Sequence, residues 1–463
     1  MIKAIVGAGG KTSFIKSETK RYLAQGLKVF VTTSTHMFIE PDTLLTDNAD
    51  KIIWELEHKH YAMAGIPNGM KIGPLSMETY ETVCRYADVV LIEADGSKHM
   101  PIKFPQEGEP VIYPNVDEVV VICGLHALGQ KLSQAAHRLE LVKKCLQADD
   151  NEIIQASHIQ KLVMKGYVEP MREKYAEKKI TVRPNSGDSL YQKAVAKLME
   201  AEVDVSILKE KWFAPQPTLI VCGAGHVSCE LVKMAACLDF YIKVIDDREE
   251  FADPERFKPA DEVICDTFEH LERYLEPDAY YVVLTRDHKD DFACVKTILS
   301  HSYEYLGMIG SKKKVKTTFE KLREAGVEEE RIQTVFAPIG LDIQAVTPAE
   351  IAVSILGQII LEKNKKCCSF ASRELLSTRK AGTLCVITEK YDSSPRGEGS
   401  MMFVTDTEVI DTIGGGAVEF AAIQEARNGS GVRTREYRLN MEKNKELGMI
   451  CGGSNKVLFI PIS

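Results

Sequence analysis

The chain has 463 residues, of which 44% are hydrophobic and 27% charged, and its formal net charge is −9. This composition is typical of a globular protein, and a length of roughly 150 residues per domain predicts about three domains. The acidic balance argues against a general nucleic-acid binder, whose surface would be basic, and it leaves room for a local basic pocket.

The cysteines and the apolar runs indicate a cellular compartment. The twelve cysteines include no C-x-x-C pair, so neither a zinc site nor a disulfide framework is predicted. The first residues predict a strand rather than a signal peptide, and no apolar run reaches the roughly twenty residues that span a bilayer. We therefore expect a cytoplasmic protein without membrane contact, and we expect it to be a homo-oligomer.

The first predicted domain covers residues 1–207, where short apolar runs alternate with helix-like stretches. Buried strands are predicted at Lys3–Val6, Lys28–Thr33, Asp88–Glu93 and Glu118–Cys123, and helices near Thr12–Gln25, Ser76–Arg85 and Ser189–Glu200. This alternation predicts an α/β fold with a parallel sheet.

A glycine-rich loop, VGAGGKT at residues 6–12, joins the first strand to the first helix. In a P-loop-like arrangement, the amides of Gly7, Gly9 and Gly10 would hold a phosphate at the helix N-terminus. Lys11 would reach the outer phosphates and Thr12 would hold Mg²⁺. The loop is shorter than the standard one, because an isoleucine stands five residues before Gly10. The ligand expected here is ATP, GTP or another nucleotide with Mg²⁺.

Two further clusters follow strands of the same predicted sheet: TTSTHM at residues 32–37 and LIEADGS at residues 91–97. Asp95 is a candidate catalytic residue, and Thr12 and Asp95 are candidate ligands of a hydrated metal ion. The alternatives are a capped turn at His36 and a simple Asp-Gly turn at Asp95. No metal site is certain from the sequence.

This part of the chain resembles the YqeC family, which comprises accessory proteins of selenium-dependent molybdenum hydroxylases. The matching segments are GAGGKTS, TTSTHM, EADGSKHMPIK and the later EPVI at residues 109–112. The resemblance implies an accessory role and does not specify a reaction.

A second domain is predicted over residues 217–363, after a linker near residues 209–217. Strands are predicted at Thr218–Cys222, Tyr241–Asp246, Asp261–Cys265, Tyr280–Thr285 and Glu304–Met308, and TPAE at residues 347–350 predicts a capped helix start.

The turn CGAGHVS at residues 222–228 and an acid about twenty residues later predict a Rossmann fold. Gly223 and Gly225 would approach a cofactor, and Asp246 could accept hydrogen bonds from ribose hydroxyls. Because a fold does not specify its ligand, NAD(P) is less favoured than the fold itself.

Polar residues follow other strands of this domain. His288 could be a catalytic base, a metal ligand or only the first residue of a helix. Ser311 and Lys312 could bind an anionic phosphate, or the lysine run could be a solvated helix face. The block is similar to the Rossmann domain of the XdhC/CoxI family, from GAGHV through GSKKK to APIGLDI and TPAEIAVSI. The family usually has His where this chain has Arg286.

The third predicted domain, residues 375–463, is a small α+β unit with three glycine-rich turns that carry Arg396, Glu419 and Cys451. Such turns let the backbone approach a ligand. The motifs SSPR, GGGAVE and GMICGG resemble the small domain of the XdhC/CoxI family, although Asp392 replaces the usual first glycine. The resemblance implies binding of molybdopterin cofactor and help in loading it into molybdenum hydroxylases.

The resemblance places the cofactor between the Rossmann edge and these turns. Arg396 and Lys312 would pair with its phosphate, while Gly415 and Glu419 would lie along the pterin, with Glu419 on its amine edge. Cys451 could approach the metal or the transferable sulfur or selenium, or it could be a small buried residue.

The leading hypothesis is a maturation factor that binds molybdopterin for a molybdenum hydroxylase apo-enzyme, with a cysteine desulfurase or selenium donor as a further partner. One alternative is an NAD(P)-dependent oxidoreductase acting through Gly223, Gly225 and Asp246. Another is a P-loop NTPase or nucleotide-handling enzyme acting through Lys11. The sequence leaves open whether any step is catalytic.

Overall fold

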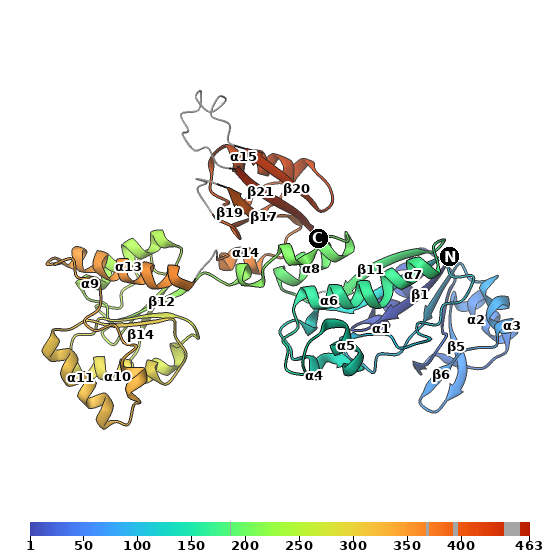
Figure 1. Cartoon of the computed structure of the whole chain (residues 1–463), viewed down its shortest axis with the longest axis horizontal. Coiled ribbons are helices and arrows are strands. Elements are labelled where there is room, and N and C mark those ends of the chain that lie inside the picture. The colour runs from blue at the N-terminus through green and yellow to red at the C-terminus, as the bar shows by residue number, and fades with distance from the viewer. Residues whose placement is uncertain (186, 367–369, 392–396, 439–453) are drawn as a thin grey trace.

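The computed structural model describes residues 1–185, 187–366, 370–391, 397–438 and 454–463. Its strands form an N-terminal mixed sheet, a central parallel sheet and a C-terminal antiparallel sheet, together with a separate two-stranded pair. Figure 1 shows the central part on one side, the N-terminal part on the other and the C-terminal sheet above the helix between them. None of the described helices combines the length and the apolar composition needed to cross a membrane.

The N-terminal part contains β1 (Ile2–Gly7), α1 (Lys11–Leu23), β2 (Val29–Thr33), β3 (Met37–Phe38), β4 (Thr43–Leu45), α2 (Ala49–Lys59), β5 (Tyr61–Asn68), β6 (Lys71–Gly73), α3 (Met77–Cys84), β7 (Val89–Glu93), β8 (Ile102–Lys103), β9 (Glu118–Gly124), α4 (Leu132–Ala135), β10 (Ala136–His137), α5 (Leu139–Leu146), α6 (Ala156–Val163), α7 (Glu169–Lys174), β11 (Lys179–Asn185) and α8 (Leu190–Glu200).

The N-terminal sheet has the order β11-β9-β1-β7-β2-β5-β6-β3, with β4 paired to β5. The central strand β1 is parallel to both β7 and β9, so the residues that follow these strands meet at one edge. The predicted α/β class is confirmed, but the sheet is mixed because β6 turns back antiparallel to β5. The turn uses Gly69 with a φ of 62°, and the Asn68-Gly69 pair is a hairpin signal that our sequence reasoning missed.

The central part contains β12 (Thr218–Cys222), α9 (His226–Ala235), β13 (Tyr241–Asp246), β14 (Glu262–Cys265), β15 (Tyr280–Val283), α10 (His288–Leu299), β16 (Tyr305–Met308), α11 (Lys312–Glu324), α12 (Glu329–Ile332) and α13 (Pro348–Lys366).

The central strands form a parallel Rossmann-like sheet in the order β14-β13-β12-β15-β16. Helices α9 and α13 contribute to the core on one face, and α10 and α11 to the core on the other. The predicted capping box of α13 is present: Thr347 Oγ1 accepts from the Glu350 amide at 3.3 Å, and the Glu350 carboxylate accepts from the Thr347 amide at 2.9 Å. All five strands predicted for this part are found.

The C-terminal part contains α14 (Arg373–Ser377), β17 (Gly382–Tyr391), β18 (Met401–Val404), β19 (Val409–Asp411), α15 (Gly416–Asn428), β20 (Arg433–Arg438) and β21 (Ser454–Ile462). Its antiparallel sheet has the order β19-β18-β17-β21-β20.

Both faces of the C-terminal sheet are buried. Cys385 and Ile387 belong to the core that includes α15, whereas Leu384 and Val386, on the opposite face, belong to the core of the N-terminal part. Trp212, in the segment predicted as a linker, is 2% exposed and packs closely on Gly399. The N- and C-terminal parts therefore share a hydrophobic core, while the central sheet has cores of its own.

Candidate functional site

The glycine loop between β1 and α1 is held in a conformation that requires glycine. Gly7, Gly9 and Gly10 have φ values of 98°, 77° and 139°, which residues with a side chain rarely adopt. A Cβ on Gly7 would lie 2.0 Å from the carbonyl oxygen of Ile122, and one on Gly9 would lie 2.5 Å from that of Pro101. Close packing of the loop against the neighbouring chain is therefore one reason for these glycines, besides any contact with a ligand.

The N-terminus of α1 is open to an anion. Gly10 precedes the helix and has no side chain that could cap it, while Thr12 and Ser13 are exposed in the first turn. Free amides at a helix start and the helix dipole both favour negative charge. Asn185 supports the loop from β11 by donating a hydrogen bond to the Gly9 carbonyl at 2.9 Å.

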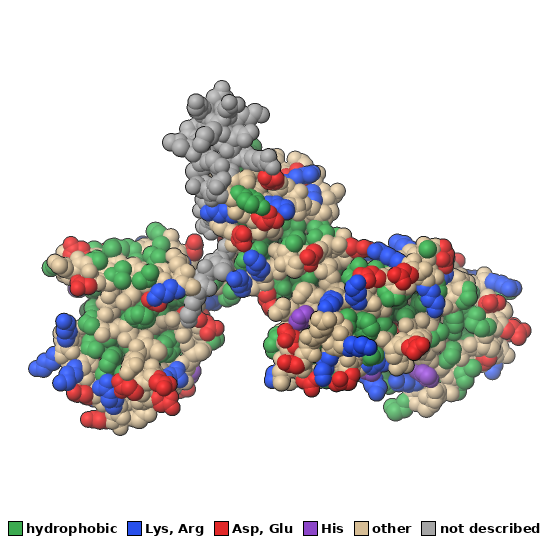
Figure 2. All heavy atoms as spheres, in the orientation of Figure 1, with side chains coloured by type: hydrophobic (Ala, Val, Ile, Leu, Met, Phe, Trp, Pro, Cys, Tyr) green, Lys and Arg blue, Asp and Glu red, His purple; other side chains and the backbone are tan. Residues whose placement is uncertain are grey.

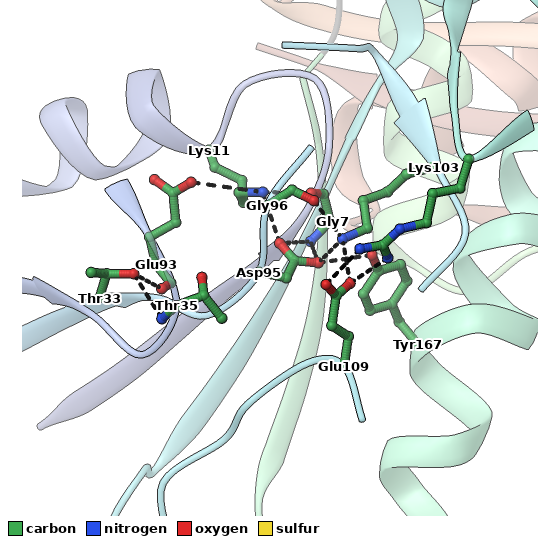
Figure 3. A network of polar contacts seen from close by, with 11 residues as sticks. Gly7, Lys11, Thr33, Thr35, Glu93, Asp95, Gly96, Lys103, Glu109 and Tyr167 are labelled. Atoms are coloured by element: carbon green, nitrogen blue, oxygen red, sulfur yellow. Dashed lines mark hydrogen bonds and ion pairs between the residues drawn. The ribbon is translucent and has the colours of Figure 1, made fainter. Parts of the chain in front are cut away.

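Lys11 is buried and points back into its own loop (Figure 3). Its ammonium donates to the Gly7 carbonyl at 2.8 Å and to Asp95 Oδ1 at 2.7 Å. The predicted phosphate-binding lysine and the predicted carboxylate are thus brought together, in a direct ion pair.

Asp95 is fully buried and both of its oxygens have partners. They accept from the Gly7 amide at 3.1 and 3.0 Å, from Lys103 at 2.8 Å and from the Tyr167 hydroxyl at 2.9 Å, as well as from Lys11. Burial opposes ionisation, but the charges of Lys11 and Lys103 outweigh it and hold the pKa of Asp95 below its usual range. A metal ion at Asp95 would have to displace one of these donors, and its metal or catalytic role stays a prediction.

The ion-pair network extends beyond Asp95 to residues that the sequence did not single out. Lys103 also contacts Glu109 at 3.2 Å, and Glu109 forms a two-bond pair with Arg138 at 2.5 and 2.6 Å. These bonds and the Lys103 charge outweigh burial and lower the pKa of Glu109. Lys103 lies within the EADGSKHMPIK motif, in an apolar stretch between Ile102 and Phe104, which is the one signal that could have identified it.

Glu93, the last residue of β7, is the carboxylate that this network leaves without a hydrogen bond among the described residues. It is 8% exposed, and its Oε1 lies 3.9 Å from the Lys11 ammonium (Figure 3). Burial, only partly offset by Lys11, raises the pKa of Glu93 to about 7. Sequence reasoning emphasised Asp95 and overlooked Glu93, although both follow the same strand.

A cavity of about 900 Å³ lies against this edge of the N-terminal sheet. Its lining includes Gly9, Gly10, Lys11, Thr12, Ser13, Thr35, His36, Phe38, Lys71, Glu93, Lys98, His99, His126, His137 and Arg138. The cavity brings together residues from all three predicted N-terminal clusters. Over the face shown in Figure 2, positive and negative side chains alternate, so the described surface in that view is mixed in charge.

The Rossmann loop has a similar construction. Gly223 has a φ of 108°, and a Cβ there would lie 2.4 Å from the Leu284 carbonyl oxygen, while Gly225 directly precedes α9. Asp246 is buried and accepts from the Ala224 amide at 2.7 Å and from the Arg248 guanidinium at 2.8 Å. Those bonds outweigh burial and lower the pKa of Asp246. The carboxylate therefore braces the loop, and its predicted contact with a ribose is untested.

The other predicted residues of the central part lie at helix starts. Ser311 caps α11 by accepting from the Lys314 amide at 3.3 Å, and Lys312 is the exposed first residue of that helix. His288 is the exposed first residue of α10. Among the described residues, no group of three or more His, Cys, Asp or Glu side chains is arranged to hold a metal ion.

In the C-terminal part, Glu419 organises its own glycine turn. Its Oε2 accepts from the amides of Ile413 and Gly415, both at 3.0 Å, and from the Thr412 hydroxyl. Gly415 has a φ of 72° and precedes α15. Arg396 and Cys451 lie outside the described residues, so their predicted roles remain predictions.

Three family models match the chain. They are the YqeC protein at residues 3–140, the XdhC Rossmann domain at 219–359 and the XdhC and CoxI family at 375–438. The chain therefore carries a YqeC N-terminal domain followed by XdhC Rossmann and XdhC/CoxI domains, as the motifs predicted. This places it among homologues of xanthine dehydrogenase accessory factors.

Curated relatives match about a third of the chain each. It is 35% identical over 157 residues to the uncharacterized protein YqeB of Escherichia coli K12, covering 32% of this chain and 28% of that protein. It is 35% identical over 147 residues to the uncharacterized protein YqeC of the same strain, covering 29% and 56%. It is 29% identical over 153 residues to a probable xanthine dehydrogenase component of Bacillus subtilis 168, covering 33% and 44%. The chain thus spans little more than half of these relatives at most.

Proposed function

We propose that this protein is a maturation factor for molybdenum hydroxylases of the xanthine dehydrogenase type. It binds molybdopterin cofactor and assists its modification with sulfur or selenium, or its insertion into the apo-enzyme. The domain matches support this proposal, because XdhC Rossmann and XdhC/CoxI domains occur in one chain. The name of the Bacillus subtilis relative points to the same class of enzyme.

The observation that carries the proposal is the carboxyl edge of the Rossmann sheet. The chain runs outward from β12 through β13 to β14, then returns to β15 on the other side of β12, and ligands bind at such reversals in open α/β sheets. The Gly223 loop closes on Leu284 at this reversal. With the starts of α9 and α11 at the same edge, the backbone there suits the phosphate of the cofactor.

Glu419 supports the pterin side of the proposal indirectly. Its Oε2 accepts the hydrogen bonds that shape the Gly415 turn, so Glu419 would act on a ligand by holding the turn rather than by Oε2 alone. The alternative of a nicotinamide-dependent oxidoreductase gains no support, because both oxygens of Asp246 are already hydrogen-bonded to the loop amide or to Arg248.

The test is retention of cofactor by the full chain expressed in cells that make molybdopterin. Molybdenum and the fluorescent pterin oxidation product are measured per chain in the wild type and in Lys312→Ala, with Lys316→Ala as control. Lys316 lies one turn further along α11 and is 79% exposed in its side chain. Retention should fall in Lys312→Ala only. The proposal is rejected if the wild type carries no pterin and a co-expressed hydroxylase is equally active without this protein.

A further inference from the structure

The N-terminal cavity is separate from the Rossmann edge and carries its own reactive groups. We propose that it is a catalytic site that binds a magnesium nucleoside triphosphate and transfers the terminal phosphoryl group to water, with Glu93 as the proton acceptor. This activity goes beyond the proposed function and does not depend on it.

The phosphate end of the ligand fits the glycine loop. The first-turn amides of α1 have no side-chain cap, and the exposed Thr12 hydroxyl stands beside them in the cavity lining. Amides and dipole would hold the phosphates, and Thr12 would join the oxygen shell of Mg²⁺ together with phosphate oxygens and water. Lys71, Lys98 and Arg138 add positive charge to the lining.

Lys11 can move to a phosphate without leaving Asp95 unpaired. Lys103 at 2.8 Å, Tyr167 at 2.9 Å and the Gly7 amide at 3.0 Å would still hold the buried carboxylate. Removing the only partner of a buried charge is costly, but here the other donors remain. The second buried lysine thus makes Lys11 available to the ligand.

Glu93 is the observation that points to chemistry rather than to binding alone. A carboxylate that is more than nine-tenths buried normally has hydrogen-bond donors, yet Glu93 has none among the described residues, and it lines the cavity beside Lys11. A water molecule held against a terminal phosphate would supply the missing donor.

The other part of the cavity favours a flat ring. Phe38 and His99 stack with centroids 5.1 Å apart, and both line the cavity. Phe38 is 44% exposed, and the Lys71 ammonium lies 4.7 Å from its ring centroid. An exposed aromatic pair beside a phosphate loop fits a nucleoside better than an inorganic polyphosphate.

The reaction balances without another reactant. Water attacks the terminal phosphorus and forms a new P–O bond, while its proton passes to a Glu93 oxygen. The bond from that phosphorus to the bridging oxygen breaks, and the electron pair leaves with the nucleoside diphosphate. Glu93 then releases its proton to solvent, so the products are nucleoside diphosphate, inorganic phosphate and one proton. No electron is transferred.

The experiment measures phosphate release from Mg·ATP, Mg·GTP, Mg·CTP and Mg·UTP, and binding of a non-hydrolysable Mg·ATP analogue, with the full chain. We expect Glu93→Gln to lower kcat at least about 10²-fold and still to bind the analogue. Lys11→Ala should lose binding of the analogue. The control is Glu118→Gln, an isosteric change at the start of β9, at the opposite edge of the sheet, and it should match the wild type.

Circular dichroism shows whether each variant is folded, and binding by the wild type tests the site should Glu93→Gln misfold. The proposal is overturned if the wild type neither hydrolyses any of the four nucleotides nor binds the analogue, or if Glu93→Gln turns over at the wild-type rate. Faster cleavage of inorganic tripolyphosphate than of all four nucleotides would overturn the assignment to nucleotides. None of these results bears on pterin retention, so the two proposals fail separately.

Discussion

The Lys11 ammonium lies 2.7 Å from Asp95 Oδ1, and the Lys103 ammonium lies 2.8 Å from the other oxygen of the same carboxylate. Lys11 and Lys103 have side chains that are 3% and 0% exposed, so one buried carboxylate carries two buried cations. Glu109, bonded to Lys103, brings the second negative charge. The glycine loop is thus fixed by a network that is nearly neutral before any ligand arrives.

The first prediction concerns the stability that Lys103 provides. Lys103→Met leaves Asp95 and Glu109 each without a buried partner, so the free energy of unfolding of the N-terminal part should fall by about 3–5 kcal/mol. Urea unfolding measures the loss. Lys16→Met is the control, because its exposed pair with Glu40 should contribute at most about 1 kcal/mol. Equal losses in the two variants would contradict a structural role for the network.

The sequence predicted what short segments determine. Apolar runs located the strands of the Rossmann sheet, and the glycine turns located both loops. The partners of Asp95 were not predictable in this way, because Tyr167 is 72 residues away and meets Asp95 only through the tertiary fold. The contact between Trp212 and Gly399 is similarly distant in sequence. Local patterns therefore indicated the phosphate loop but not the network that braces it.

The second prediction concerns the pH dependence that Glu93 imposes on stability. Its pKa is about 7 in the folded chain and near 4.5 in the unfolded chain, so the folded state binds the proton more tightly. Stability contributed by the protonated form is present below about pH 4.5 and is lost as pH rises through 7. Glu93→Gln lacks this loss, so its advantage over the wild type should grow by about 3 kcal/mol between pH 5 and pH 8. Thermal unfolding at both pH values measures it.

Glu118→Gln serves as a control of opposite sign. Burial of Glu118 is outweighed by hydrogen bonds from Lys179 and Lys3, which lower its pKa. Its stabilising contribution is therefore present above the usual glutamate range and is lost in acid, so this variant should be less stable than the wild type at pH 8. A shift in the same direction for both variants would show that a general charge effect, and not burial of Glu93, is responsible.

The third prediction separates backbone strain from close packing in the glycine loop. Gly7 and Gly26 both have positive φ, but a Cβ on Gly7 meets the Ile122 carbonyl at 2.0 Å, whereas one on Gly26 meets nothing within 4 Å. Gly26→Ala should cost about 1–2 kcal/mol for strain alone, and Gly7→Ala should cost more. Urea unfolding at one pH compares them. Similar costs would mean that the loop can move away from β9.

The fourth prediction follows from the distribution of the cores. Leu458 of β21 belongs to the core of the N-terminal part, and Ile242 of β13 belongs to a core of the central sheet. Calorimetry should therefore resolve two transitions, one for the N- and C-terminal parts together and one for the Rossmann sheet. Leu458→Ala should lower the first and Ile242→Ala the second, each by about 2–5 kcal/mol. If Leu458→Ala instead produces a third transition, the C-terminal sheet unfolds alone, and the shared core does not couple it to the N-terminal part.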